Sequence, residues 1–204
     1  IKAARDYFYL GEIAQEMVDF SKQQGGLLTL EDLSDFHVEV ETPPSIDYKG
    51  TQVFTCGPWC QGPVTIQALK ILEGFDLQTL EHNSADYLHI VIEALKLAFA
   101  DRHAYYGDPD FVDVPMKGLL DSDYASQRRK EIDMTRAHPE MPYAGDPWPF
   151  EGRVNSSVRA KHPEPVGGPF PADTSYISTV DRWGNAFSAT PSDGIGAAPI
   201  VKGL

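Results

Sequence analysis

Hydroxyl side chains gather near the end of this chain, where their spacing suits nucleophilic chemistry. Residues 175–180 and 185–190 are rich in β-branched, aromatic and small residues, which predicts two strands. Between them, the Asp-Arg-Trp-Gly run at 181–184 is typical of a type I turn with a left-handed glycine, the usual three-residue hairpin loop. In the register that this loop sets, Thr174 lies directly opposite Ser192, so two hydroxyls would meet at the open end of the hairpin.

A threonine hydroxyl is a poor nucleophile unless a base lies beside it. If the chain were cut between Asp173 and Thr174, the freed α-amine of Thr174, with a pKa of about 7.7–8.0 in peptides, could serve as that base. Composition alone favours the simpler interpretation, in which Thr and Ser are ordinary residues of a half-exposed strand with no catalytic role. Both interpretations stay open on these residues.

Other polar groupings point less clearly to chemistry. Asp101-Arg102-His103 ends a predicted helix, where such a trio is usually a solvated cluster of ion pairs. His82 and His89 could share a helix face, but no carboxylate completes a set of three or four convergent ligands. The sequence also lacks a Gly-x-Ser-x-Gly elbow and the glycine loops that bind phosphate. We therefore predict neither a metal site nor a cofactor.

The composition excludes several classes of partner. The chain has 17 Lys and Arg against 30 Asp and Glu, a formal net charge of −13, which argues against binding to nucleic acid or anionic membranes. No apolar run reaches the roughly 18–20 residues of a membrane-spanning helix. Residues 1–20 lack the pattern of a signal peptide. Cys56 and Cys60 are too few for a disulfide framework; we predict two buried free thiols, although their spacing could permit a local bridge.

The first two thirds of the chain predict mainly helices. Apolar periodicity predicts helices over 7–24, 64–73, 84–106 and 122–132. Thr29 is expected to cap a further short helix, with an acid at the third position and flanking leucines as a hydrophobic staple. Elsewhere in this part, loose alternation predicts a strand from Tyr48 to Cys56.

The helix at 84–106 is the strongest of these predictions. Asn83 or Ser84 can cap it. One apolar stripe, expected to face the core, consists of Leu88, Val91, Ile92, Leu95 and Phe99.

Two blocks of sequence carry a resemblance to a known family. Residues 25–33 read GGLLTLEDL. The longer and more specific block reads EALKLAFADR at 93–102 and YGDPDFVDVP at 106–115. On these residues the chain resembles the γ-glutamyltransferases, which are members of the N-terminal-nucleophile hydrolase superfamily.

This resemblance implies an enzyme made as a precursor that cleaves itself before a threonine. Thr174 would be the nucleophile of a γ-glutamyltransferase or glutathione hydrolase-like activity, which passes a γ-glutamyl group to water or an amine. The cleaved bond would join Asp173 to Thr174. Ser192 would support the nucleophile by a hydrogen bond, with Ser175 and Thr190 beside it.

The implied fold is α+β, part of a four-layer αββα sandwich whose two subunits stay together. Residues 1–134 would be a mainly helical part of the large subunit, 135–173 a Pro/Gly-rich linker to the processing site, and 174–204 the start of the small subunit. The arginine that grips the substrate carboxylate would precede Ile1 and the oxyanion glycines would follow Leu204, so we expect a partial chain. The expected partners are the rest of the same precursor and a glutathione-like amide; a periplasmic or extracellular location is compatible with the family, and the sequence leaves the compartment open.

Three departures from the family pattern bear on substrate choice. Tyr176 stands where the family has histidine, and Gly194 where it has a substrate-binding asparagine, with Asp193 as the neighbouring candidate. The run GPWCQG at 57–62 stands where the family often has PPSSGG. These departures leave open an acylase acting on a glutaryl or β-lactam side-chain amide. Because the chain is undivided between Asp173 and Thr174, a non-catalytic, uncleaved binding relative is a second alternative.

Overall fold

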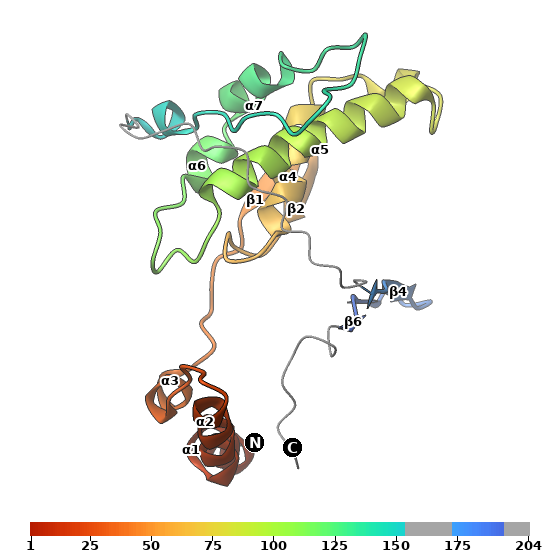
Figure 1. Cartoon of the computed structure of the whole chain (residues 1–204). Helices are drawn as coiled ribbons and strands as arrows, with labels where there is room; N and C mark the ends of the chain where they lie inside the picture. Colours follow the sequence, from red (N-terminus) through yellow and green to blue (C-terminus); the bar gives the residue numbers. More distant parts are fainter. Residues whose placement is uncertain (154–172, 194–204) are drawn as a thin grey trace. The chain divides into compact units, whose positions relative to one another are not determined.

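The computed structural model describes residues 1–153 and 173–193, which belong to two compact units, one holding 1–40 and 173–193 and the other 41–153. The described helices are α1 (Lys2–Leu10), α2 (Glu12–Gln23), α3 (Leu30–Asp35), α4 (Gly62–Leu72), α5 (Ala85–Tyr105), α6 (Met116–Leu119) and α7 (Ser122–Arg129), with short 3-10 helices η1 (Leu77–Thr79) and η2 (Trp148–Glu151) (Figure 1). The described strands form antiparallel pairs: β1 (Ser45–Tyr48) with β2 (Thr51–Phe54), β4 (Ile177–Val180) with β5 (Ala186–Ala189), and β3 (Asp173–Thr174) with β6 (Ser192–Asp193).

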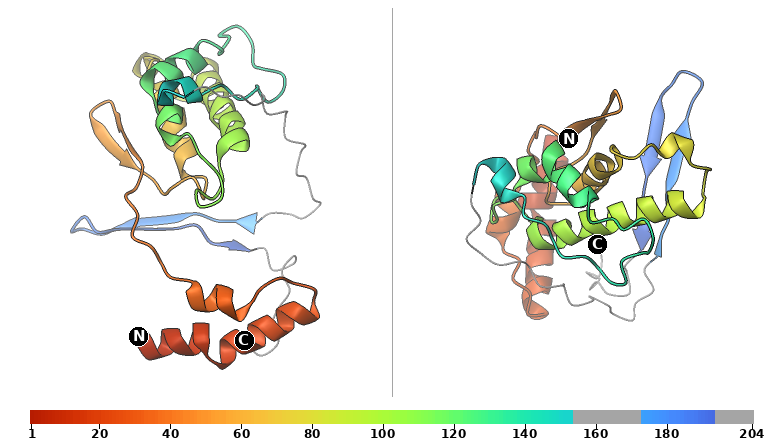
Figure 2. Two further views of the ribbon diagram at one scale, coloured as in Figure 1. Left: turned by 90° about the vertical axis from the view of Figure 1, so that its left-hand side faces the viewer. Right: turned by 90° about the horizontal axis from the view of Figure 1, so that it is seen from above.

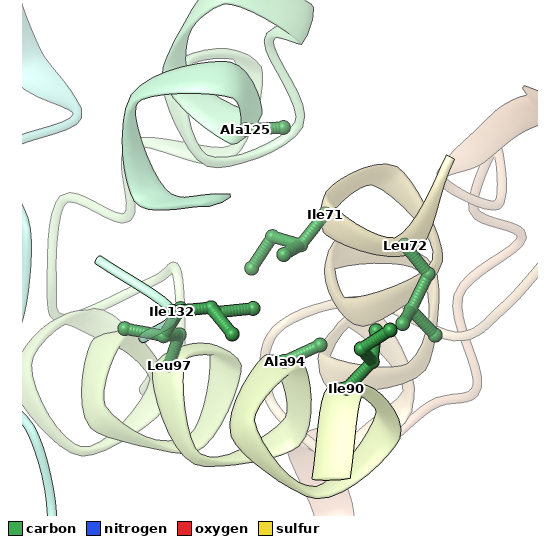
Figure 3. Packing of buried hydrophobic residues seen from close by; sticks show 7 residues of the cluster. All are labelled: Ile71, Leu72, Ile90, Ala94, Leu97, Ala125 and Ile132. Atoms are coloured by element: carbon green, nitrogen blue, oxygen red, sulfur yellow. The ribbon is translucent and has the colours of Figure 1, made fainter. Parts of the chain in front are cut away.

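The core of the larger unit lies where α4 meets α5 and α7 (Figure 2). Apolar side chains from the three helices converge there, and a residue beyond the end of α7 completes the cluster. Figure 3 shows them: Ile71, Leu72, Ile90, Ala94, Leu97, Ala125 and Ile132. Burying these side chains is the main force that holds the helices together.

The long helix α5 has the length that the sequence predicts, and Ser84 is its cap. The Tyr87 N–H donates to the Ser84 hydroxyl at 3.2 Å, which satisfies one of the free N–H groups of the first turn. Asn83 instead adopts a left-handed conformation with φ 59° and turns the chain into the helix.

Replacing Ser84 by alanine is expected to lower the free energy of unfolding by about 1 kcal/mol, because the Tyr87 N–H would lose its acceptor. Denaturant melts of the purified protein measure the change. Asn83→Gly is the matched control, since glycine tolerates the positive φ at that position, and it should have the smaller effect. Equal losses in the two variants would contradict the assignment of Ser84 as the cap.

The prediction that the apolar stripe of α5 faces the core holds only for Val91 and Phe99, which pack against buried clusters, and is wrong for the rest of the stripe. Its members Leu88, Ile92 and Leu95 are 43%, 49% and 37% exposed. The opposite side of the helix is buried instead, and it includes two acidic residues among apolar ones: Ile90, Glu93, Ala94, Leu97, Ala98, Ala100 and Asp101. The buried acids have partners outside α5, and helical periodicity cannot reveal such partners.

The prediction of one helix over 7–24 is also wrong, because the chain breaks at Gly11 between α1 and α2. Gly11 has extended backbone with φ −103° and ψ −155°. A Cβ on this residue would lie 2.6 Å from the Tyr7 carbonyl oxygen, so the break brings backbone too close for any side chain. Within α2, Ala14 and Val18 are buried.

The short helix α3 begins as the sequence predicts. The Asp32 N–H donates to the Thr29 hydroxyl at 3.1 Å, and the Thr29 N–H donates to the Asp32 carboxylate at 2.8 Å, which completes a capping box. Leu28 and Leu33 belong to the same apolar cluster, as expected for a staple.

A hairpin replaces the single strand predicted at 48–56. Tyr48 ends β1, and the chain returns as β2 after a two-residue turn. Lys49 and Gly50 both have positive φ, 52° and 83°, as a type I′ turn requires. Lysine is uncommon at such a φ, so the residues gave a weak turn signal.

The segment after α7 differs in part from the expected linker. Helix α7 ends at Arg129, earlier than the predicted 132, and the chain that follows is tied to the helices. The Tyr105 hydroxyl donates to the Gly145 carbonyl at 2.7 Å, for example. The rest of the expected linker, residues 154–172, lies outside the described residues.

Candidate active site

The hairpin of β4 and β5 has the turn and register that the sequence predicts. Ile177 pairs with Ala189, and Gly184 takes the left-handed conformation with φ 84°. Inside the turn, the Asp181 carboxylate accepts from the Asn185 side-chain amide at 2.8 Å and from the Asn185 N–H at 2.9 Å. The side-chain bond from Asn185 is the main cause that lowers the pKa of Asp181. The turn is therefore fixed by its own residues.

The same register continues to the open end of the hairpin. There the predicted pairing of Thr174 with Ser192 is confirmed. The pairs in this region are Asp173 with Asp193, Thr174 with Ser192, and Ser175 with Pro191, whose carbonyl accepts the Ser175 N–H at 2.9 Å.

One face of this hairpin carries hydroxyl residues at consecutive positions. Because strand residues alternate between faces, every second residue from 176 falls on this face, as do their partners. The hydroxyl face comprises Tyr176, Ser178, Ser188 and Thr190, and the backbone pair of Thr174 with Ser192 follows it in the same register. Within it the Ser188 hydroxyl donates to the Tyr176 phenol oxygen at 3.2 Å. Hydrogen bonds from Ser188 and then Ser178 lower the pKa of Tyr176.

The remaining candidate residues fall at different places. Thr190 belongs to the hydroxyl face, while Ser175 falls on the opposite face of the hairpin. Asp193 lies opposite Asp173 at the end of β6. Gly194 lies outside the described residues. Support of the nucleophile by Ser175 and Thr190, and substrate binding by Asp193 and Gly194, stay predictions.

The expectation of a solvated ion-pair cluster at 101–103 is wrong, because Asp101 is fully buried. Its carboxylate faces Arg128, whose Nη2 lies 3.3 Å from Oδ1 and which is itself only 1% exposed. Burial raises the pKa of the Asp101 carboxyl, and the Arg128 guanidinium is the strongest influence in the other direction. The pair is a buried salt bridge between α5 and α7.

Three further groups donate to Asp101. The Gln67 amide and the Tyr124 hydroxyl reach Oδ2 at 2.5 and 2.8 Å, and the Gly145 N–H reaches Oδ1 at 2.8 Å. Sequence reasoning missed this network, since its members come from α4, α5, α7 and the loop after α7. The only local signal was that Asp101 follows Leu97 by one helical turn and so shares its buried face.

The described residues contain neither a membrane-spanning helix nor a metal-binding cluster. There, no helix is both long and apolar enough to cross a membrane. Within 1–153 and 173–193, no three His, Cys, Asp or Glu residues come together in a way that could hold a metal ion.

The sequence also matches a family model along nearly its whole length. The model described as gamma-glutamyltranspeptidase covers residues 2–204. The chain belongs to the gamma-glutamyltranspeptidase family. A curated relative in this family, the glutathione hydrolase proenzyme of Bacillus subtilis subsp. natto, is 36% identical over 187 residues, which are 91% of this chain and 31% of that protein.

Solved structures of gamma-glutamyltranspeptidase family members and acylases are similar to this chain. The gamma-glutamyltranspeptidase of Helicobacter pylori matches with a TM-score of 0.63 and 32% identity, covering 68% of this chain and 40% of that one. A cephalosporin acylase from Bacillus halodurans matches with a TM-score of 0.62 and 40% identity, covering 70% of this chain and 26% of that one. The chain spans about 30% of the length of the curated relatives that it matches.

Proposed function

We propose that the protein containing this chain is a γ-glutamyltransferase-like amidohydrolase or acyltransferase whose nucleophile is Thr174. The pairing of Thr174 with Ser192 at the open end of the hairpin carries the proposal. Membership of the gamma-glutamyltranspeptidase family supports it, since a curated relative is named a glutathione hydrolase proenzyme. The substrate class is a γ-glutamyl amide of the glutathione type.

In this proposal the nucleophile is created by cleavage between Asp173 and Thr174. The new α-amine of Thr174 takes the proton from its own hydroxyl as the oxygen attacks the amide carbon. The proton then passes to the leaving amine, and the acyl group stays on Thr174 as an ester. Water or an acceptor amine attacks this ester, gives its proton to the α-amine, and regenerates the free threonine.

The neighbours of Thr174 have supporting roles in the same scheme. Ser192 hydrogen-bonds the attacking hydroxyl and Thr190 lies beside it. Ser175, on the opposite face, supports the strand through its N–H, which donates to the Pro191 carbonyl at 2.9 Å. Asp193 and Gly194 are the proposed substrate-binding residues. The two pieces of the cleaved precursor remain together in a four-layer αββα sandwich, in which the exposed apolar residues Ile177 and Phe187 become covered.

Mass spectrometry of the purified full-length protein tests the cleavage. Two fragments, one beginning at Thr174, are expected. A single intact chain that persists for days would rule out self-processing and would favour the alternative of a non-catalytic binding relative. This measurement needs no knowledge of the substrate.

An acylase that acts on another amide is the second candidate. Tyr176, on the hydroxyl face, stands where the resemblance implies histidine, and the similar cephalosporin acylase supports this alternative. The comparison that separates the two is hydrolysis of a γ-glutamyl and a glutaryl chromogenic amide. Faster turnover of the γ-glutamyl compound supports the first candidate, and faster turnover of the glutaryl compound supports the acylase.

Replacing Ser192 by alanine is expected to slow turnover by about 10–10³-fold, because the hydroxyl that supports Thr174 would be lost. Steady-state kinetics on the preferred chromogenic amide measure the loss. Ser188→Ala is the matched control, since it removes a hydroxyl from the same face near the turn, where it contacts Tyr176. Unchanged kinetics in Ser192→Ala would show that the Ser192 hydroxyl does not support Thr174.

A further inference from the structure

Two thiols flank the turn that leads from β2 into α4. They are the 2 cysteines of the chain, and both are free. Cys56 is exposed and Cys60 is half-buried, so the prediction of two buried thiols is wrong for Cys56. An exposed thiol four positions before a partly protected one is an arrangement that can do redox chemistry.

The backbone folds the two cysteines toward one another. The Cys60 N–H donates to the Gly57 carbonyl at 3.2 Å, and this turn brings the Cα atom of Cys60 within about 7 Å of that of Gly57, the residue directly after Cys56. The Gly62 N–H donates to Cys60 Sγ at 3.3 Å. A Cβ on Gly62 would lie 3.2 Å from the Cys56 nitrogen and would overlap the Thr55 side chain. Both cysteines therefore lie against the same glycine, and only glycine allows so close an approach.

The two thiols differ in a way that assigns them different roles. Burial raises the pKa of the Cys60 thiol, the Gly62 N–H opposes this, and a hydrogen bond with the Cys56 side chain adds to the increase. An attacking thiol must be accessible, whereas a resolving thiol needs only to reach its neighbour. Cys56 has the first property and Cys60 the second.

We propose that Cys56 and Cys60 form a redox-active dithiol site whose substrates are small disulfides of the glutathione type. The Cys56 thiolate attacks one sulfur of the small disulfide, whose S–S bond breaks and releases one thiolate. A mixed disulfide on Cys56 results. Cys60 then loses its proton to solvent and attacks Cys56 Sγ, which forms the Cys56–Cys60 bond and releases the second thiolate.

This exchange balances without another reagent. Two electrons pass from the protein dithiol to the small disulfide, which leaves as two thiols, and two small thiols reverse the reaction. The turn is held on both sides while this happens. Trp59 donates from Nε1 to Glu41 at 3.0 Å, and α4 begins at Gly62 with a mostly buried face. The reaction is independent of Thr174 and its proposed activity.

Peptide mass spectrometry of the full-length protein tests the site. The protein is equilibrated in buffers with a graded ratio of glutathione to glutathione disulfide, quenched with an alkylating agent and digested. The peptide containing both cysteines is expected to carry two alkyl groups under reducing conditions and to lose two hydrogens under oxidising ones. Digestion isolates this peptide from any cysteine elsewhere in the protein.

Single cysteine variants separate the attacking thiol from the resolving thiol. Cys60→Ser should trap one glutathionyl group on Cys56, and Cys56→Ser should react several-fold more slowly, because Cys60 is less exposed and less easily ionised. Two observations would each overturn the proposal. One is a wild-type peptide that stays doubly alkylated, or stops at the mixed disulfide, in the most oxidising buffer. The other is a cross-link that survives the most reducing buffer, which would make the bond structural rather than redox-active.

Discussion

In the full-length protein, replacing Thr174 by alanine is expected to abolish both cleavage after Asp173 and turnover of the amide substrate. The variant loses the only hydroxyl proposed to attack either bond, and removal of a nucleophile typically costs about 10⁶-fold in rate. Mass spectrometry measures the cleavage, and a chromogenic amide measures the turnover. The variant should stay folded, since the pairing around Thr174 runs through the backbone.

Two controls make the Thr174 result specific. Thr174→Ser keeps a hydroxyl and, after cleavage, an α-amine, so it should retain part of both activities. Thr179→Ala removes a hydroxyl from the opposite face of β4 and should leave both unchanged. A Thr174→Ala protein that is cleaved and active would remove this residue from the mechanism.

The hairpin could be predicted because its determinants are local. Asp181, Gly184 and Asn185 form their bonds within five residues of sequence, and the register follows from the turn alone. The pairing of Thr174 with Ser192 was therefore accessible without any knowledge of the rest of the fold. A substrate pocket beside that pair would be built by residues distant in sequence, and no local rule predicts it.

The buried side of α5 could not be predicted, because its partners are distant in sequence. Helical periodicity ranks the sides of a helix by their apolar residues, and the side containing Leu88 and Leu95 has more of the large ones, whereas the buried side has mostly alanine and two acids. The helix instead buries the side with Glu93 and Asp101. The charge of Asp101 is met by groups from other elements. The Glu93 carboxylate accepts from Lys96 of the same helix at 2.7 Å and from the distant backbone N–H of His138 at 3.2 Å.

The exposed stripe of α5 also has a physical consequence. Ile92, Leu95, Phe99 and Met141 line a mainly apolar hollow of about 300 Å³ on the outer side of the helix. Large apolar side chains left open to water are costly, so a helix that is apolar on two sides is expected to be covered on both. The sequence pattern correctly identified an apolar surface of α5. Within the described part of the chain, however, α4 and α7 pack against the other side of the helix.

The salt bridge of Asp101 and Arg128 is the feature of the helical unit most sensitive to a single change. Each carboxylate oxygen of Asp101 accepts two donors, so the side chain has no free acceptor site facing an apolar group. Arg128 also donates to the backbone carbonyls of Leu97 and Tyr143, at 3.3 and 3.0 Å. A charge buried in this way is stabilising only while its partner is present.

Replacing Asp101 by asparagine is therefore expected to lower the free energy of unfolding by about 3–5 kcal/mol. The shape of the side chain is preserved, but Arg128 loses its buried counter-charge and keeps only Glu131, a half-exposed carboxylate 2.7 Å from Nη1. In addition, the new amide nitrogen would face two donors, the Tyr124 hydroxyl and the Gln67 amide. The Gln67 amide resists a flip, because its oxygen already accepts from the Tyr106 hydroxyl at 3.1 Å. Urea melts of the purified protein measure the loss.

Two further variants separate the lost charge from the lost hydrogen bonds. Tyr124→Phe removes one donor to Asp101 and leaves the charge pair intact, so it should cost about 1.5–3 kcal/mol. The double variant Asp101→Leu, Arg128→Met removes both charges and should be less destabilised than the sum of its single variants, because neither charge is left unpaired. If the stability losses of Asp101→Leu and Arg128→Met simply add in the double variant, Arg128 does not depend on Asp101. The stability of this unit then rests on the apolar cluster around Ile71 instead.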